Sequence, residues 1–410
     1  MTTRLPPLLR LMTASAVLAL PAWTAMAASA VVTPPTTTTP VAPTRITVGE
    51  QAFNDKSLSA GGNLACASCH TNATAHADPA GTFLPLGGPR LDQQGNRSSQ
   101  SLAYLATNKP FRLDVEGRPH GGFFWDGRAA TLREQAGGPL LNPSEMANAS
   151  VDEVVTRLKA APYFADLTRL FNVAPDATAA VLFDTLRQAL VAYETGDADY
   201  QLFNSKFDRV LDGKAKLTVA EARGFSVFND PRKGNCASCH TSTVGADGSR
   251  PLFTNFTYHA LGLPRNKAIK ANSDPNFYDL GVCGPVRTDL AYRVDLCGQF
   301  KVPTLRNIAL TGPYFHNATA STLAQAISFY ATRDLDPARW YPLVNKRPDK
   351  FNDMPLGFRG NVTQTPPFGP LPGNKPRLTA QDVSDLAAFL RTLTDDVKAP
   401  AGSRTVAQRP

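Results

Sequence analysis

The chain has 410 residues, of which 42% are hydrophobic and 19% are charged, so it can build more than one hydrophobic core. This composition excludes a disordered chain, and no internal apolar run reaches the roughly 20 residues of a membrane span. The net charge of +8 is modest and contains no block of Lys or Arg, which argues against a nucleic-acid partner.

Residues 1–27 have the pattern of a secretory signal peptide. Arg4 and Arg10 make a basic start, Leu11 to Trp23 is a short apolar stretch, and Ala25 to Ala27 fits the small-x-small cleavage rule. An uncleaved membrane anchor is the alternative. A Thr/Pro-rich linker follows over residues 28–46, so we expect the folded protein to begin near Ile46. Export predicts a periplasmic, oxidising location.

Two CxxCH motifs carry most of the chemical information. They consist of Cys66, Cys69 and His70, and of Cys236, Cys239 and His240. CxxCH attaches c-type haem, because its two thiols bind the porphyrin covalently and its His binds the iron. A redox CxxC pair would need a βαβ context that is missing, and a zinc site would need more neighbouring ligands than His76. We therefore predict two covalently bound haem c groups.

The sequence around the motifs is also repeated. Phe53 to Asp55 and Phe228 to Asp230 both read Phe-Asn-Asp, and each is followed by a Gly-containing loop and then by CxxCH. The two motifs lie 170 residues apart. This long period predicts a duplicated haem domain and excludes a short-period repeat array.

The predicted elements, in chain order, are helices. Apolar residues recur at three- and four-residue steps over residues 151–171 and 177–193. Thr218 with Glu221, and Thr379 with Asp382, are helix-capping patterns, the second opening a C-terminal helix. Strand patterns are sparse. We predict an all-α fold of two cytochrome c-like haem domains in tandem with long loops, meeting near residues 196–215. The expected segments are 47–200 for the N-terminal peroxidatic domain, 201–397 for the C-terminal electron-transfer domain and 398–410 for a flexible tail.

Few residues remain to fill the second axial position of each iron. Outside the motifs, and after removal of the signal peptide, the candidates are His76, His120, His259, His316, Met146 and Met354.

Two longer segments resemble a known family. Phe123 to Met146 reads FFWDGRAATLREQAGGPLLNPSEM, and Phe300 to His316 reads FKVPTLRNIALTGPYFH. Both are similar to ordered motifs of the bacterial di-haem cytochrome c peroxidases and their MauG-type relatives, and the resemblance extends over residues 47–397.

The resemblance implies roles for individual residues. His70 and His240 match the proximal ligands, Trp125 matches a Trp that relays electrons between the haems, and Gln135 and Glu145 match the distal pocket of the N-terminal haem. A carboxylate can move a proton between the two peroxide oxygens, and an amide can orient peroxide without titrating. From the residues alone, the preferred roles are a packing aromatic for Trp125 and, for Glu145, helix capping in the turn that begins at Asn142.

The sequence departs from the family at two ligand positions. The loop from Leu84 to Gln100 lacks the His that blocks the N-terminal iron in peroxidases requiring reductive activation, although His120 is a candidate substitute. We therefore expect an iron open to peroxide. Fourteen residues after His316, where the peroxidases carry Met, stands Tyr330, as in MauG. We expect Tyr330 to ligate the C-terminal haem, with Met354 as the alternative.

The last two cysteines, Cys283 and Cys297, lie away from the haem motifs. In an exported protein a disulfide between them is expected, worth about 3 kcal/mol by loop closure, and free thiols are the alternative. Related sequences often show a similar pair.

The resemblance also implies a calcium ion between the domains. Thr311 and Pro313 match its carbonyl ligands, but Ser98 stands where the family has Asn. Hard oxygen ligands could be completed by water.

These expectations combine into an enzyme of the cytochrome c peroxidase type. It would reduce hydrogen peroxide to water with electrons from a small soluble donor, a cytochrome c or a cupredoxin. The alternatives are a MauG-type enzyme that oxidises a protein or organic substrate and a pure di-haem electron carrier. A homodimer is an open alternative for the oligomeric state.

Overall fold

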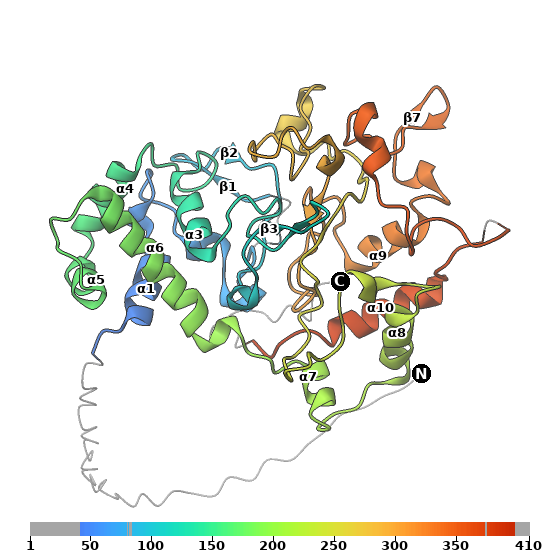
Figure 1. Ribbon diagram of the computed structural model, residues 1–410, viewed down its shortest axis with the longest axis horizontal. Helices are drawn as coiled ribbons and strands as arrows, with labels where there is room; N and C mark the ends of the chain where they lie inside the picture. The colour runs from blue at the N-terminus through green and yellow to red at the C-terminus, as the bar shows by residue number, and fades with distance from the viewer. Residues whose placement is uncertain (1–41, 80, 82–83, 374, 398–410) are drawn as a thin grey trace, which may run out of the picture. The chain divides into compact units, whose positions relative to one another are not determined.

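The computed structural model describes residues 42–79, 81, 84–373 and 375–397 (Figure 1). The predicted signal peptide, linker residues 28–41 and the tail 398–410 lie outside the described residues. Within the described ranges, none of the helices combines the length and the apolar character needed to cross a membrane.

The described chain is mostly helical with small sheets. Its α-helices are α1 (Arg45–Asn54), α2 (Cys66–Cys69), α3 (Leu132–Leu141), α4 (Val151–Ala160), α5 (Phe164–Phe171), α6 (Ala179–Gly196), α7 (Lys206–Leu211), α8 (Val219–Asn229), α9 (Leu323–Thr332) and α10 (Ala380–Arg391). The antiparallel strand pairs are β1 (Leu86–Gly87) with β2 (Gln93–Gln94), β3 (Arg112–Leu113) with β4 (Pro119–His120), β5 (Tyr258–His259) with β6 (Phe300–Lys301), and β7 (Leu343–Val344) with β8 (Arg347–Pro348). The all-α expectation is therefore incomplete, because short ladders pair backbone groups within the loops.

The helix starts predicted from capping residues are confirmed. Thr218 accepts the backbone N–H of Glu221 at the start of α8, and Thr379 accepts that of Asp382 at the start of α10. The segment 151–171, predicted as one helical stretch, is two helices. Helix α4 ends at Ala160 because Pro162 disfavours helical backbone at the residue before it.

The helix before each CxxCH motif crosses a helix that follows the motif in the chain. Helix α1 packs on α6, and α8 packs on α10 (Figure 1). Each crossing contains a glycine at the point of closest approach. A Cβ on Gly49 would collide with the carbonyl of Ala189, and a Cβ on Gly224 would collide with the carbonyl of Asp385. The backbones can therefore approach closely enough to place each motif against a core.

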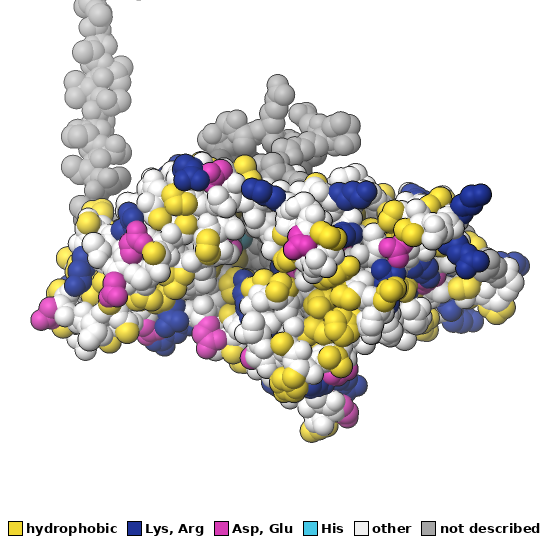
Figure 2. Space-filling view, turned by 90° about the horizontal axis from the view of Figure 1, so that it is seen from above, with side chains coloured by type: hydrophobic (Ala, Val, Ile, Leu, Met, Phe, Trp, Pro, Cys, Tyr) yellow, Lys and Arg dark blue, Asp and Glu magenta, His cyan; other side chains and the backbone are white. Residues whose placement is uncertain are grey.

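Each CxxCH motif has a hydrophobic core beside it. One core gathers side chains between Val48 and Tyr200 and packs on Cys66, while another gathers side chains between Phe207 and Leu393 and packs on Cys236. On the face shown in Figure 2, Lys and Arg side chains are interspersed with Asp and Glu.

Candidate haem sites and their surroundings

The first CxxCH motif occupies a single helical turn. Helix α2 carries Cys66 and Cys69, and His70 follows as its C-cap. The Nδ1 of His70 lies 2.8 Å from the carbonyl oxygen of His76, so it carries the proton and leaves Nε2 free for a metal. Burial lowers the pKa of His70, which favours the neutral imidazole that metals bind.

The second motif repeats this arrangement. Cys236 and Cys239 lie in and after the 3-10 turn η5 (Cys236–Ser238), and Nδ1 of His240 lies 2.8 Å from the carbonyl oxygen of Phe253. Burial lowers the pKa of His240 to about 4. Both proximal candidates therefore present a neutral ring with a fixed orientation.

The thiols do not resemble those of a redox or zinc site. Burial raises the pKa of Cys66 and of Cys236 to about 12, whereas a redox CxxC needs a lowered thiol pKa. Within the described part of the chain, there is also no cluster of three His, Cys, Asp or Glu side chains that could hold a metal.

A cavity of about 290 Å³ adjoins the second motif. Cys236, Cys239 and His240 line it together with apolar side chains such as Leu261 and Ile327. An apolar cavity beside two thiols and a neutral His fits a covalently attached haem. The residues at the second motif therefore fit a covalently bound haem.

Both candidates for the second axial ligand lie at this cavity. Tyr330, on α9, packs on Phe368 at 5.3 Å between ring centroids, and burial raises the pKa of its phenol. Met354 is 4% exposed and contacts Gly298, where a Cβ would collide with the thioether. Tyr330 and Met354 therefore both line the cavity beside the second motif.

The distal-pocket candidates lie near the first motif. Glu145 acts electrostatically on the thiols of Cys66 and Cys69, and its Oε1 accepts a hydrogen bond from Asn142 Nδ2 at 2.7 Å. Burial raises the pKa of Glu145, and the Arg128 guanidinium partly opposes this shift. A half-buried carboxylate with a raised pKa is suited to general base chemistry.

Gln135 lies on α3, which packs in the same core as Cys66. Its Oε1 is buried and has no hydrogen-bond partner among the described residues. A buried amide oxygen without a partner is costly, and it is available to a bound polar ligand.

Trp125 contacts both Ser98 and His316, which are far apart in the sequence. Its Nε1 donates to the carbonyl of Ser98 at 2.9 Å, and its ring centroid lies 6.5 Å from that of His316. His316 stacks on Phe300 at 3.5 Å, and its buried Nε2 has no partner within the described residues. The contact between Trp125 and His316 was not predicted, although Phe123 to Leu132 and Tyr314 to Leu323 can be aligned to place the two at equivalent positions.

Backbone hydrogen bonds around this pair are reciprocal. The N–H of Ser98 donates to the carbonyl of His316, and the N–H of Lys301 donates to the carbonyl of Trp125, both at 2.8 Å. An unpredicted buried ion-pair network lies beside them: Arg97 binds Asp126 at 2.7 Å and Asp279 at 2.6 Å.

The remaining histidines have other partners. Nε2 of His120, on β4, lies 3.1 Å from Asp114, and His76 stacks on Tyr200 at 3.8 Å. Nε2 of His259 lies 3.4 Å from the sulfur of Cys239. Among the calcium candidates, Thr311 and Pro313 line the cavity, while the Ser98 hydroxyl donates to the carbonyl of Phe315.

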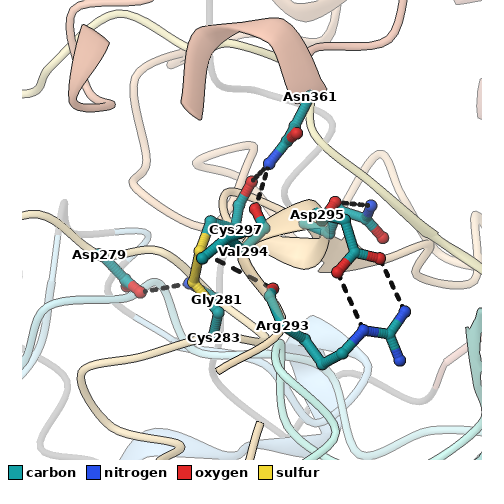
Figure 3. The surroundings of a disulfide bond; sticks show 9 residues. Asp279, Gly281, Cys283, Arg293, Val294, Asp295, Cys297 and Asn361 are labelled. Atoms are coloured by element: carbon teal, nitrogen blue, oxygen red, sulfur yellow. Dashed lines mark hydrogen bonds and ion pairs between the residues drawn. A yellow bond between two sulfur atoms is a disulfide. The ribbon is translucent and has the colours of Figure 1, made fainter. Parts of the chain in front are cut away.

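Cys283 and Cys297 form a disulfide (Figure 3). Asn361 donates to the carbonyl of Cys297 at 3.1 Å, and the N–H of Gly281 donates to Asp279 at 3.1 Å. The bridge therefore fixes the loop that carries Asp279, the partner of Arg97.

Comparisons with known proteins place the chain in a family. The di-haem cytochrome c peroxidase family matches over residues 43–216. The chain is 36% identical to the methylamine utilization protein MauG of Paracoccus denitrificans, over 85% of this chain and 88% of that protein. It is 29% identical to the cytochrome c551 peroxidase of Nitrosomonas europaea, over 74% of this chain and 77% of that protein.

A solved structure is similar over most of the chain. The diheme peroxidase BthA from Burkholderia thailandensis shares 38% identity with a TM-score of 0.78, over 87% of each chain. The length and level of these similarities establish that the chain belongs to the di-haem cytochrome c peroxidase and MauG family and is an oxidoreductase.

Proposed function

We propose that this chain is a periplasmic di-haem c peroxidase that reduces hydrogen peroxide to water. The observation that carries the proposal is the half-buried carboxylate of Glu145 near the first CxxCH motif, together with the buried amide oxygen of Gln135, which has no hydrogen-bond partner among the described residues. Haem attached through the Cys66–His70 motif supplies the iron at which the O–O bond is cleaved. An electron carrier has no use for a base and an open amide at this place.

Glu145 takes a proton from the iron-side oxygen of peroxide and returns it to the leaving oxygen. Asn142 holds the carboxylate in place, and burial keeps its pKa nearer the working pH than that of an exposed Glu. Gln135 orients peroxide by accepting a hydrogen bond at Oε1, and it does not titrate.

The second site stores and supplies electrons. Cys236, Cys239 and His240 would hold the second haem, and Tyr330, in preference to Met354, would be the further protein ligand of its iron. Tyrosinate is a hard anionic ligand that lowers the haem potential relative to a thioether. Trp125 relays electrons between the two sites, which belong to tandem domains over residues 47–200 and 201–397. The donor is a small soluble cytochrome c or cupredoxin.

A MauG-type oxidation of a protein or organic substrate is the second candidate function. The observation that favours it is Tyr330 at the cavity, together with the loop from Leu84 to Gln100, which contains no His. His120 is engaged with Asp114, which argues against its blocking the first iron. Both candidate functions also include a calcium ion. The carbonyls of Thr311 and Pro313 would bind it, and water would replace the family Asn at the position of Ser98.

The test is a titration of the fully oxidised holoprotein with one equivalent of hydrogen peroxide, followed by optical and EPR spectroscopy and compared with a half-reduced sample. Turnover of peroxide with a reduced cytochrome c or cupredoxin supports the peroxidase. An immediate reaction of the oxidised form that holds two oxidising equivalents, without donor turnover, favours the MauG-type function. No response of either haem to peroxide or cyanide would refute both.

A further inference from the structure

Tyr104 lies in the wall of the cavity beside the second motif and is 3% exposed. Its hydroxyl donates to Oδ2 of Asp395 at 2.5 Å and accepts the N–H of Phe203 at 3.1 Å. Burial raises the pKa of Tyr104, so the phenol is protonated at neutral pH. Its hydrogen bond gives the phenol proton a defined acceptor.

The acceptor is itself held rigidly. Asp395 is 4% exposed, its Oδ2 also accepts from Asn307 Nδ2 at 2.8 Å, and its N–H donates to Asn307 Oδ1 at 2.7 Å. Tyr104 and Asn307 both have left-handed backbone, with φ of 66° and 61°. Two similarly shaped turns thus converge on one carboxylate, but only Tyr104 contributes an oxidisable ring.

A neighbouring charge determines how Tyr104 could be oxidised. The guanidinium carbon of Arg306 lies 5.0 Å from the centroid of the Tyr104 ring. An oxidised phenol is strongly acidic, so loss of an electron is accompanied by loss of the proton, and the charge of Arg306, which is paired with Asp208, adds to this preference. Asp395 is placed to receive that proton.

Contacts also connect Tyr104 to the first motif. Its N–H donates to the carbonyl of Tyr200 at 2.8 Å, Tyr200 stacks on His76, and the His76 carbonyl accepts from His70. Tyr104 therefore touches the second cavity on one side and a chain of contacts from His70 on the other. This connection does not pass through Trp125.

We propose that Tyr104 is a redox-active residue that holds one oxidising equivalent, with Asp395 as its proton acceptor. The inference rests on the proposed peroxidase function. Tyr104 would give one electron to the haem pair once peroxide had oxidised it; the O–H bond breaks, the proton moves to Asp395 Oδ2, and a neutral phenoxyl radical is left, while the second oxidising equivalent stays with the haem pair. One electron from the small redox donor and the returning proton restore the phenol.

The experiment treats the oxidised holoprotein with one equivalent of hydrogen peroxide without donor, freezes it and records EPR spectra. We expect a tyrosyl signal that narrows when the protein is made with ring-deuterated tyrosine. Tyr104→Phe should lose the signal, and Asp395→Asn should lose most of it. The matched control is Tyr341→Phe, which should keep the tyrosyl signal. Tyr341 is equally buried, but it donates to the carbonyl of Gly262, which cannot take a proton.

The possible outcomes distinguish failure of this inference from failure of the proposed peroxidase function. If the haem bands respond to peroxide but no tyrosyl signal forms, or if the same signal persists in Tyr104→Phe, the inference is wrong and the peroxidase stands. If the haem bands do not respond, both fail. Should Tyr104→Phe not fold, Asp395→Asn decides: loss of most of the tyrosyl signal supports the inference, and an unchanged signal overturns it.

Discussion

Glu145 shows how burial prepares a single carboxylate for proton transfer. The residue acts as a base only when it is deprotonated, and burial raises its pKa above the ordinary value of about 4.3. Peroxide turnover should therefore fall as the pH drops through this raised pKa. Glu145→Gln should lower kcat about 100-fold or more and abolish the acidic limb of the pH profile. Exposed Glu116→Gln is the control, and an unchanged profile in Glu145→Gln would remove Glu145 from the mechanism.

Tyr330 and Met354 compete for one position at the cavity. If Tyr330 ligates the second iron, Tyr330→Phe changes the optical and EPR spectra of the oxidised protein and raises the potential of that haem, because a hard anionic ligand is lost. Met354→Leu keeps the volume and should leave the spectra unchanged. The reverse pattern would assign Met354 as the ligand.

Glu194 has a buried carboxyl group with an effect on stability. It is 4% exposed, its Oε2 has no partner among the described residues, and burial raises its pKa to about 8. Between the unfolded pKa of about 4.3 and this value, the folded state binds more protons, so the free energy of unfolding falls as the pH rises. We expect a loss of about 3–4 kcal/mol between pH 5 and pH 8.

Glu194→Gln removes this titration and should flatten the dependence of stability on pH, measured by urea unfolding of the holoprotein. Glu50→Gln, an exposed change on α1, is the control. A wild-type stability that does not fall between these pH values would contradict the assignment.

The sequence reveals the residues of the site more readily than their mutual contacts. CxxCH is a local motif, and its two thiols and His lie on one turn wherever the fold places them. Contacts such as Trp125 with His316, or Arg97 with Asp279, join residues more than 150 positions apart, and only tertiary packing brings them together. The choice between Tyr330 and Met354 is likewise a question of distance to a cofactor.

Among the helices and strands too, features set by nearby residues are predictable from the sequence, and features set by tertiary packing are not. Capping pairs such as Thr218 with Glu221 are predictable because the contact spans three residues. The break at Pro162 outweighs an otherwise continuous apolar pattern. The two-residue strands escape prediction because a ladder this short leaves no alternating pattern.

The glycines at the helix crossings give a prediction for whole elements. Gly224→Ala places a methyl group against the carbonyl of Asp385 and should force α8 away from α10. The expected cost is about 1–3 kcal/mol, offset in part by the better helix propensity of Ala. Urea unfolding followed by circular dichroism measures it. Gly357→Ala, where a Cβ meets open space, should be close to neutral, and equal effects of the two changes would refute the packing argument.

At the scale of the whole molecule, the Arg97 network joins the two predicted halves. Arg97 comes from the first half, as does Asp126, and Asp279 comes from the second. Arg97→Ala leaves the buried carboxylate of Asp279 without its cation, whereas Asp126 keeps its ion pair with Arg128, and the change should destabilise the holoprotein by about 3–5 kcal/mol. Arg90→Ala breaks only the exposed pair with Asp92 and should cost less than about 1 kcal/mol. Thermal unfolding distinguishes the two, and equal melting temperatures would show that the network contributes nothing.

The reciprocal hydrogen bonds around Trp125 and His316 have an evolutionary consequence. Ser98 binds the carbonyl of His316 just as Lys301 binds that of Trp125, so each half gives the other the contact that it receives. Self-complementary exchange of this kind defines the isologous interface of a two-fold homodimer. A single-haem ancestor that paired with its own copy would have made this contact twice from one surface. Fusion of two such copies would free each position to diverge, which would account for the indole of Trp125 at one position and the imidazole of His316 at the other.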